Sequence, residues 1–148
     1  MTMETGNEQQ TVGVILVTHS DYGSALLCAT EAILGPLQDC CAIGLDTSQA
    51  PSETAERLQD AVKRLDRGVG VILLTDMFGG TPTNMSLSLM GNCQVDVVTG
   101  VNLPMLLKVF SARHLDLFEL SAQARDAGIK GIVAAGEMLR SKVKPGQA

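Results

Sequence analysis

The chain has 148 residues, a length that suits one domain with a substantial apolar core. Its net charge is −5 and its eleven basic residues are scattered, which argues against a nucleic-acid surface and against a nucleic-acid partner. No apolar run reaches the roughly 20 residues that a membrane helix needs, and the polar first residues do not have the pattern of a signal peptide. We therefore expect a soluble, cytoplasmic protein.

Three segments are expected along the chain. Residues 1–11 are polar and predict a disordered N-terminus, residues 12–139 predict one folded domain, and residues 140–148 predict a polar C-terminal tail. The four cysteines form no C-x-x-C pair, so we expect them to be reduced and to serve as packing residues. They are Cys28, Cys40, Cys41 and Cys93.

Short continuous apolar runs alternate with segments of helical period, a pattern typical of an α/β fold with a parallel sheet covered by helices. The runs that predict buried strands are Val12–Val17, Cys40–Leu45, Val69–Leu74 and Gln94–Val98. The helices expected between and after them start near Ser24, Pro51, Pro82, Pro104 and Asp116, and their expected ends are Gly35, Gly68, Gly91, Ala112 and Ala127, with Gly128 closing the last. A short final strand is expected over Gly131 to Ala135.

Sheet topology should bring two of the strand ends together. In an open parallel sheet, ligands bind beyond the carboxyl ends of the strands, where successive connections leave toward opposite faces. Right-handed crossovers favour the strand order 2-1-3-4, which makes the first and third strands neighbours. The first strand leads into His19 and the third into Asp76. We therefore expect the imidazole and the carboxylate to meet at this edge.

A histidine beside a carboxylate suits nucleophilic chemistry. Imidazole, with a pKa of roughly 6.5, can attack through one ring nitrogen while a carboxylate accepts the proton on the other. We therefore expect His19 and Asp76 to be the catalytic pair. Glycine turns and hydroxyl side chains around the pair can contact an anion. The expected phosphate-binding residues are Thr18, Ser20, Gly79, Gly80, Thr81 and Thr83.

Neither of these two loops contains lysine or arginine. A site that binds phosphate tightly is expected to carry such a cation. The sequence therefore predicts a site that holds a phosphoryl group only briefly.

Three segments carry a resemblance to a known family. They are Thr18-His19, the run from Asp76 to Asn84 (DMFGGTPTN) and the run from Thr99 to Met105 (TGVNLPM). Together they resemble the IIA components of the mannose/fructose/sorbose-type sugar phosphotransferase system. The resemblance extends from Val12 to Leu139, and the two longer segments are much more specific than a single histidine.

The resemblance implies that His19 accepts phosphate from the histidine-containing phosphocarrier protein and passes it to a IIB component that serves the membrane IIC/IID complex. It implies that Asp76 holds the His19 ring and that Thr81 contacts the phosphate. It also implies a homodimer in which the strand from Gly131 to Ala135 adds antiparallel to the sheet of the other subunit. No cofactor and no metal are implied.

The chain departs from the family pattern in two respects. Family members often have glycine directly after the histidine, where this chain has Ser20 followed by Asp21. The Asp21 carboxylate would repel a phosphoryl group, so we expect it to point to solvent. Mannose transporters often join IIA to IIB, whereas this chain carries no IIB segment, so we expect IIB to act in trans or the protein to be regulatory.

Alternative functions were weighed against the same residues. A stand-alone regulatory phosphocarrier that reports metabolic state would use His19 equally well. A receiver domain phosphorylated on Asp76 would need an acidic pair after the first strand, where Thr18-His19 stand. A nucleotide-binding module would need a glycine-rich phosphate loop at that position, and a metal site built on His19 and Asp76 has too few ligands. His114, between two expected helices, is expected to be solvated.

Overall fold

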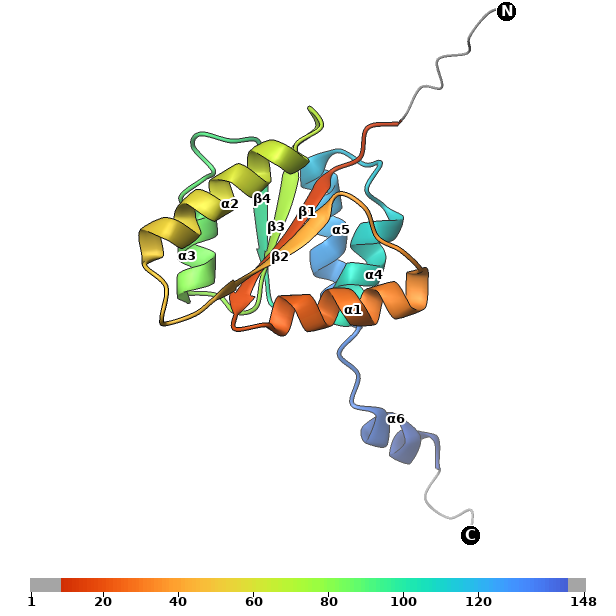
Figure 1. Ribbon diagram of the computed structural model, residues 1–148. Helices are drawn as coiled ribbons and strands as arrows, with labels where there is room; N and C mark the ends of the chain where they lie inside the picture. Colours follow the sequence, from red (N-terminus) through yellow and green to blue (C-terminus); the bar gives the residue numbers. More distant parts are fainter. Residues whose placement is uncertain (1–8, 144–148) are drawn as a thin grey trace, which may run out of the picture.

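The computed structural model describes residues 9–143 and contains a parallel four-stranded sheet in the order β2-β1-β3-β4 (Figure 1). The strands are β1 (Gly13–His19), β2 (Cys40–Leu45), β3 (Val71–Thr75) and β4 (Val95–Thr99). The α/β class and the strand order expected from the sequence are confirmed. Of the predicted N-terminal segment 1–11 and C-terminal tail 140–148, residues 1–8 and 144–148 lie outside the described residues.

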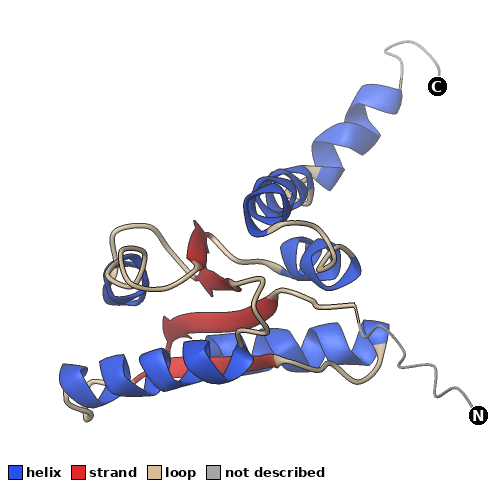
Figure 2. Ribbon diagram, turned by 90° about the horizontal axis from the view of Figure 1, so that it is seen from above, coloured by secondary structure: helices blue, strands red, loops and turns tan. Residues whose placement is uncertain are grey.

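Helices cover both faces of the sheet. The helices of the described chain are α1 (Tyr22–Leu34), α2 (Pro51–Leu65), α3 (Thr81–Leu87), α4 (Leu103–Ser111), α5 (Leu117–Lys130) and α6 (Ala135–Lys142), of which the first five cover the sheet. Helices α1, α4 and α5 pack on one face, and α2 and α3 pack on the other (Figures 1 and 2). Within residues 9–143, no helix combines the length and the apolar character that a membrane crossing requires.

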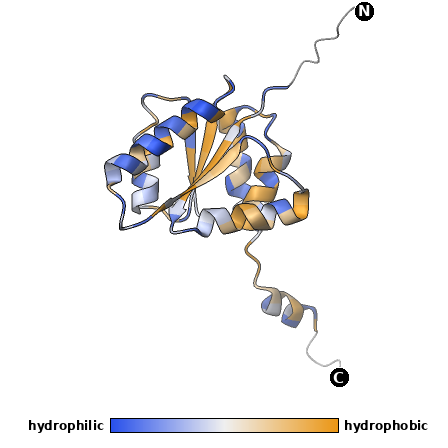
Figure 3. Ribbon diagram, viewed as in Figure 1, coloured by the Kyte–Doolittle hydropathy of each residue, from blue (hydrophilic) through white to orange (hydrophobic). Residues whose placement is uncertain are grey.

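Strand β1 illustrates why the strands are continuous apolar runs. Successive side chains of a strand point to opposite faces, so Val14 and Leu16 join the core under α4 and α5 while Ile15 and Val17 join the core under α2. All four are fully buried. Because helices cover both faces, both alternating sets must be apolar. Figure 3 shows the sheet as the most consistently hydrophobic part of the fold.

Helix α5 is longer than the sequence predicted. It continues through Gly128 to Lys130, whereas Gly128 was expected to end it. A side-chain carbon added at Gly128 would lie 2.8 Å from Cε of Met105 in α4. The glycine is therefore explained by the close approach of two helices, a role that a single sequence does not distinguish from a helix end.

The strand expected over Gly131 to Ala135 is absent from the described chain, so that prediction was wrong for the single subunit. Residues 132–134 are irregular, and Ala135 begins α6, which crosses the expected boundary between residues 139 and 140. A strand needs a neighbour for its backbone hydrogen bonds, and this segment leaves the body of the molecule and meets none (Figures 1 and 2). No side chain of α6 is buried.

The four cysteines are free thiols, as expected. Cys40, Cys41 and Cys93 are half-buried and pack against the core, whereas Cys28 is exposed on α1 and does not have the predicted packing role. Burial raises the pKa of the Cys40 and Cys41 thiols above the usual value. These two thiols are therefore less reactive than free cysteine.

Candidate active site

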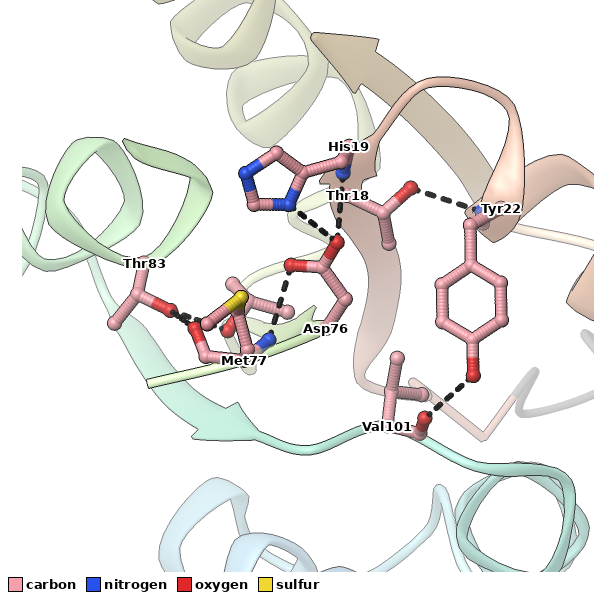
Figure 4. A network of polar contacts seen from close by, with 9 residues as sticks. Thr18, His19, Tyr22, Asp76, Met77, Thr83 and Val101 are labelled. Carbon is pink, nitrogen blue, oxygen red and sulfur yellow. Dashed lines mark hydrogen bonds and ion pairs between the residues drawn. The ribbon is translucent and has the colours of Figure 1, made fainter. Parts of the chain in front are cut away.

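His19 is the last residue of β1, and Asp76 directly follows β3. Because β1 and β3 are neighbours in register, with Val17 opposite Thr75, the two functional side chains leave the same edge of the sheet. Nδ1 of His19 lies 2.7 Å from Oδ2 of Asp76 (Figure 4). The pair expected from sheet topology is therefore in direct contact.

The Asp76 carboxylate is held by more than the imidazole. Its Oδ2 also accepts a hydrogen bond from the backbone N–H of His19 at 2.8 Å, and its Oδ1 accepts one from the backbone N–H of Met77 at 3.0 Å. Burial raises the pKa of the carboxyl, but the hydrogen bonds from His19 outweigh burial, so the pKa of Asp76 lies below its usual value. Asp76 is thus a fixed carboxylate.

This contact determines where the hydrogen of a neutral His19 lies. An ionised carboxylate can only accept hydrogen bonds, so Nδ1 carries the hydrogen and donates it to Asp76. The other ring nitrogen, Nε2, then keeps its lone pair. The side chain of His19 is 54% exposed, whereas that of Asp76 is 13% exposed. The His19 ring is thus accessible, its Nε2 can act as a nucleophile, and its orientation is fixed by the contact between Nδ1 and Asp76.

A pocket of about 330 Å³ opens beside His19. It lies between the loop that joins β2 to α2 and the start of α3, and none of its lining residues is lysine or arginine. The other lining residues are Leu45, Asp46, Thr47, Gln49, Pro51, Thr54, Thr81 and Met85. The β2–α2 loop was not predicted as part of the site. The register of Leu45 opposite His19 explains its place there, and strand ends alone could have indicated it.

Two predicted hydroxyl contacts are not available to a ligand in this structure. Thr18 is fully buried, and its hydroxyl oxygen accepts a hydrogen bond from the backbone N–H of Gly23 at 2.9 Å. Thr83 is also fully buried, and its hydroxyl contacts the Thr75 hydroxyl and the Met77 carbonyl oxygen, both at 2.7 Å. These threonines brace the loops that follow β1 and β3 (Figure 4).

The remaining predicted residues lie at the rim of the site. Thr81 lines the pocket, and Ser20 is exposed directly after His19. Gly79 has a φ of 82°, a value that favours glycine. A side-chain carbon at Gly80 would lie 3.2 Å from Cε1 of His19, so glycine lets the backbone approach the ring closely.

The β4–α4 loop is tied to the same edge of the sheet. The hydroxyl of Tyr22, at the start of α1, donates a hydrogen bond to the Val101 carbonyl oxygen at 3.3 Å (Figure 4). Asn102 caps α4 by accepting from the Met105 N–H, and its amide donates to the Gly128 carbonyl oxygen. The TGVNLPM segment therefore has mainly a structural role, in which it fixes the β4–α4 loop and the start of α4.

Of the two acidic side chains considered near His19, one lines the pocket and the other does not. Asp21 is exposed, as expected, and it is not among the residues that line the pocket. Asp46 does line the pocket, and its Oδ1 accepts a hydrogen bond from the Ser48 N–H at 3.0 Å. Across residues 9–143, no group of three or more His, Cys, Asp or Glu side chains has the arrangement of a metal site.

Comparison with known proteins identifies the family. The model of the family described as PTS system fructose IIA component matches residues 13–124. The chain belongs to this family of IIA components of the sugar phosphotransferase system. Thr18, His19 and the Asp76 loop all lie within the matched range.

Individual relatives agree with the family. The fructose-specific EIIA component of Bacillus subtilis is 34% identical over 111 residues, which cover 74% of this chain and 76% of that protein. The mannose-specific EIIAB component of Escherichia coli is 28% identical over 93% of this chain, which spans only 44% of that protein. A mannose/sorbose-specific IIA subunit from Enterococcus faecalis has a TM-score of 0.78 and 26% identity, over 84% of this chain and 95% of that one.

Proposed function

We propose that the protein is a phosphoryl carrier of the phosphoenolpyruvate-dependent sugar phosphotransferase system, with the phosphoryl group carried on His19. The observation that supports this most directly is the 2.7 Å contact between His19 Nδ1 and Asp76 Oδ2, at the edge of the sheet in a member of the IIA family. Asp76 has both carboxylate oxygens occupied by hydrogen-bond donors, which disfavours the alternative of phosphorylation on Asp76 itself.

In the proposed reaction, Nε2 of His19 attacks the phosphorus atom of a phosphohistidine on the donor. The Nε2–P bond forms while the bond between phosphorus and the donor nitrogen breaks, and the electron pair of that bond returns to the donor ring. The His19 ring becomes positive, with its Nδ1 hydrogen still bonded to Asp76. The fixed carboxylate stabilises this charge and holds the ring in place without moving a proton.

The phosphoryl oxygens would be held by neutral groups. Gly80 approaches the His19 ring closely and Thr81 lines the pocket beside it, while Ser20 and Gly79 belong to the loops that follow β1 and β3. Together they can supply O–H and backbone N–H donors. Thr18 and Thr83 act indirectly, by fixing the two loops. The absence of lysine and arginine from the pocket lining fits a group that must leave again.

The donor in this proposal is the histidine-containing phosphocarrier protein, and the acceptor is a IIB component that acts in trans and serves the membrane IIC/IID complex. The transfer takes place in the cytoplasm. Membership of the IIA family and the names of the fructose- and mannose-specific relatives support this placement. An open site supports it as well, because a partner histidine must reach His19, which is 54% exposed.

The protein is also proposed to form a homodimer by exchange of residues 131–134. The outer edge of β4 has no neighbouring strand in the described chain. A groove of about 460 Å³ runs along it, lined by residues 96–99 of β4 and by Phe118 and Arg125 of α5. Ile132 is 78% exposed and Val133 is 53% exposed. Pairing of this segment with β4 of a second copy would give hydrogen-bond partners to the backbone at the edge of β4 and would bury these apolar side chains.

Phosphorylation by the general phosphotransferase proteins tests the function. Incubation with those proteins and labelled phosphoenolpyruvate should label the wild-type chain with one acid-labile, base-stable phosphate. His19→Ala should remove the label, while His114→Ala, which changes the exposed histidine after α4, should keep it. Label that persists in His19→Ala would contradict the proposal.

A further inference from the structure

Helix α6 exposes an apolar pair that nothing covers in a single subunit. Met138 is 48% exposed and Leu139 is 66% exposed, and no side chain of α6 is buried. The helix stands apart from the body of the molecule in both ribbon views (Figures 1 and 2). Lys142 follows Met138 by four residues, so a basic residue shares the side of the helix that carries the apolar pair. Because so short a helix is not stable alone in water, α6 needs a surface to pack against.

A complementary surface lies at the start of α5. Phe118 is 70% exposed there and lines the groove along the outer edge of β4. Asp116 and Glu119, both exposed, flank it in the chain. Within the described residues Glu119 makes no ion pair, and neither do Arg140 and Lys142 in the last turn of α6. One surface is therefore apolar and acidic, and the other is apolar and basic.

Within one subunit these two surfaces lie at opposite ends of α5. A side-chain carbon added at Gly70, directly before β3, would lie 3.0 Å from Cδ2 of Leu117, so α5 begins at the amino ends of the strands. It ends at their carboxyl ends, where the Gly128 carbonyl oxygen accepts a hydrogen bond from Asn102, after β4. A helix of 14 residues is about 21 Å long. The segment that leads to α6 therefore leaves the subunit at the end of α5 that is distant from Phe118.

The proposed strand exchange places α6 at the other end of a second copy. Residues 131–134 would run antiparallel to β4 of that copy, so they enter beside its carboxyl end and leave beside its amino end. Four residues span about 13 Å, and the five residues of β4 span about 16 Å. Ala135, the first residue of α6, would then lie beside the start of that β4, at the end of the sheet where α5 also begins.

A second apolar pair near the start of β4 fits α6 less well. Leu87, at the end of α3, and Met90, in the loop before β4, are 41% and 45% exposed. Residues 81–94 contain no charged side chain, so they offer no partner to Arg140 or Lys142. Charge complementarity therefore favours the start of α5.

We infer that α6 is a docking helix for a second copy of this chain, in which Met138 and Leu139 cover Phe118 of the partner subunit. The basic residues in the last turn of α6 then face the carboxylates at the start of that α5. This inference rests on the proposed dimer and adds to it a contact beyond the exchanged strand.

Disulfide formation tests the contact directly. In a Cys28→Ser background, which removes the exposed thiol on α1, Phe118→Cys is combined with Leu139→Cys. Oxidised glutathione should convert this protein to a covalent dimer that a reductant separates, because a disulfide needs Cα atoms within about 7 Å of each other. Met90→Cys combined with Leu139→Cys is the matched control and should remain without the cross-link.

Sedimentation velocity measures how much the contact contributes. Met138→Ser and Leu139→Ser should each raise the dimer dissociation constant about tenfold or more, because burial of the side chain is lost twice in a symmetric dimer. Ile33→Ser, which changes an exposed side chain on α1, should change it less than about threefold. Lys142→Glu should weaken the dimer about two- to fivefold, and addition of Glu119→Lys should reverse this. Thermal unfolding of the dilute monomer should not change in the serine variants of α6, since no α6 side chain is buried there.

Wild-type dissociation constants in both serine variants of α6 would overturn the inference. So would a covalent dimer from the Met90 pair in place of the Phe118 pair. A wild-type protein that is monomeric at every concentration would contradict the proposed dimer itself. The two failures differ, because failure of the α6 contact alone leaves a wild-type dimer that Ile132→Asp still dissociates.

Discussion

At the scale of single residues, Asp76 fixes both the backbone at the end of β1 and the orientation of the His19 ring. Oδ2 of Asp76 accepts hydrogen bonds from both the backbone and the imidazole of His19, so the end of β1 and its side chain are fixed by the same atom. Oδ1 is fixed by Met77. The carboxylate therefore has a structural as well as a chemical role, and the two can be separated by experiment.

Asp76→Asn should destabilise the protein and slow phosphorylation. The amide NH₂ would face a backbone N–H of His19 or Met77, and an unsatisfied donor costs about 1–3 kcal/mol of unfolding free energy. The folded pKa of Asp76 lies below the unfolded value of roughly 3.9. The stabilisation is therefore complete above about pH 4 and is lost as pH falls through the folded pKa.

Denaturant unfolding from pH 3 to pH 7 measures this effect. The stability difference between wild type and Asp76→Asn should be largest at neutral pH and should shrink toward pH 3. Asp96→Asn is the matched control, because within residues 9–143 the carboxylate of Asp96, in β4, accepts a backbone hydrogen bond from its neighbour Val97 and from no distant residue. A difference between wild type and Asp76→Asn that is independent of pH would contradict the account.

Ser20 adopts a backbone conformation that favours glycine. Its φ is 52°, in the left-handed region that costs a residue with a side chain roughly 1 kcal/mol or more. Its backbone packs over Gly44 of β2, where an added side-chain carbon would overlap the Ser20 carbonyl oxygen. The turn after His19 is thus determined by close packing on the neighbouring strand.

At the scale of elements, the strands and their order were predictable, because they follow from the hydrophobic pattern of the sequence and from the crossover rules. The apolar runs gave the four strands, and crossover rules gave their order and with it the contact between His19 and Asp76. The burial of Thr18 and Thr83 was not predictable, because the sequence does not say which way a loop hydroxyl turns.

The segment from Gly131 to Ala135 was wrongly predicted as a strand for a related reason. Its β-branched residues favour a strand, but whether a strand forms depends on a neighbour that is not in the described chain. The glycine at 128 was likewise read as a helix end, although it serves the contact between α5 and α4. Both errors concern contacts between elements, which a local pattern does not contain.

The proposed dimer makes a prediction about Ile132. Ile132→Asp should convert the dimer to a monomer, because each copy would place a charge where an isoleucine is buried, and burial of one such side chain is worth about 1.5–3 kcal/mol. Ile33→Asp is the matched control, because Ile33 is also exposed, at 57%, but lies on α1. Sedimentation velocity over a range of concentrations measures both.

A wild-type protein that sediments as a monomer at every concentration would contradict the dimer. Equal dissociation by Ile33→Asp would show instead that added charge, and not the segment from 131 to 134, is responsible.

At the scale of the whole molecule, one edge of the sheet brings together residues that lie far apart in the chain, from His19 through Asp76 to Thr81. Two buried cores, one on each face of the sheet, hold β1 between β2 and β3. The chemistry depends on that order, because exchanging two strands would separate the ring from its carboxylate. The phosphoryl-carrier function follows from this arrangement and from the loops at its edge.

The most direct test is to identify the ring nitrogen that carries the phosphoryl group. Phosphorus and nitrogen NMR of the phosphorylated protein, labelled with ¹⁵N in histidine, should show phosphorus on Nε2 of His19, with the hydrogen retained on Nδ1 beside Asp76. Phosphorus on Nδ1, or on any other residue, would contradict the claim that Asp76 orients His19 for attack.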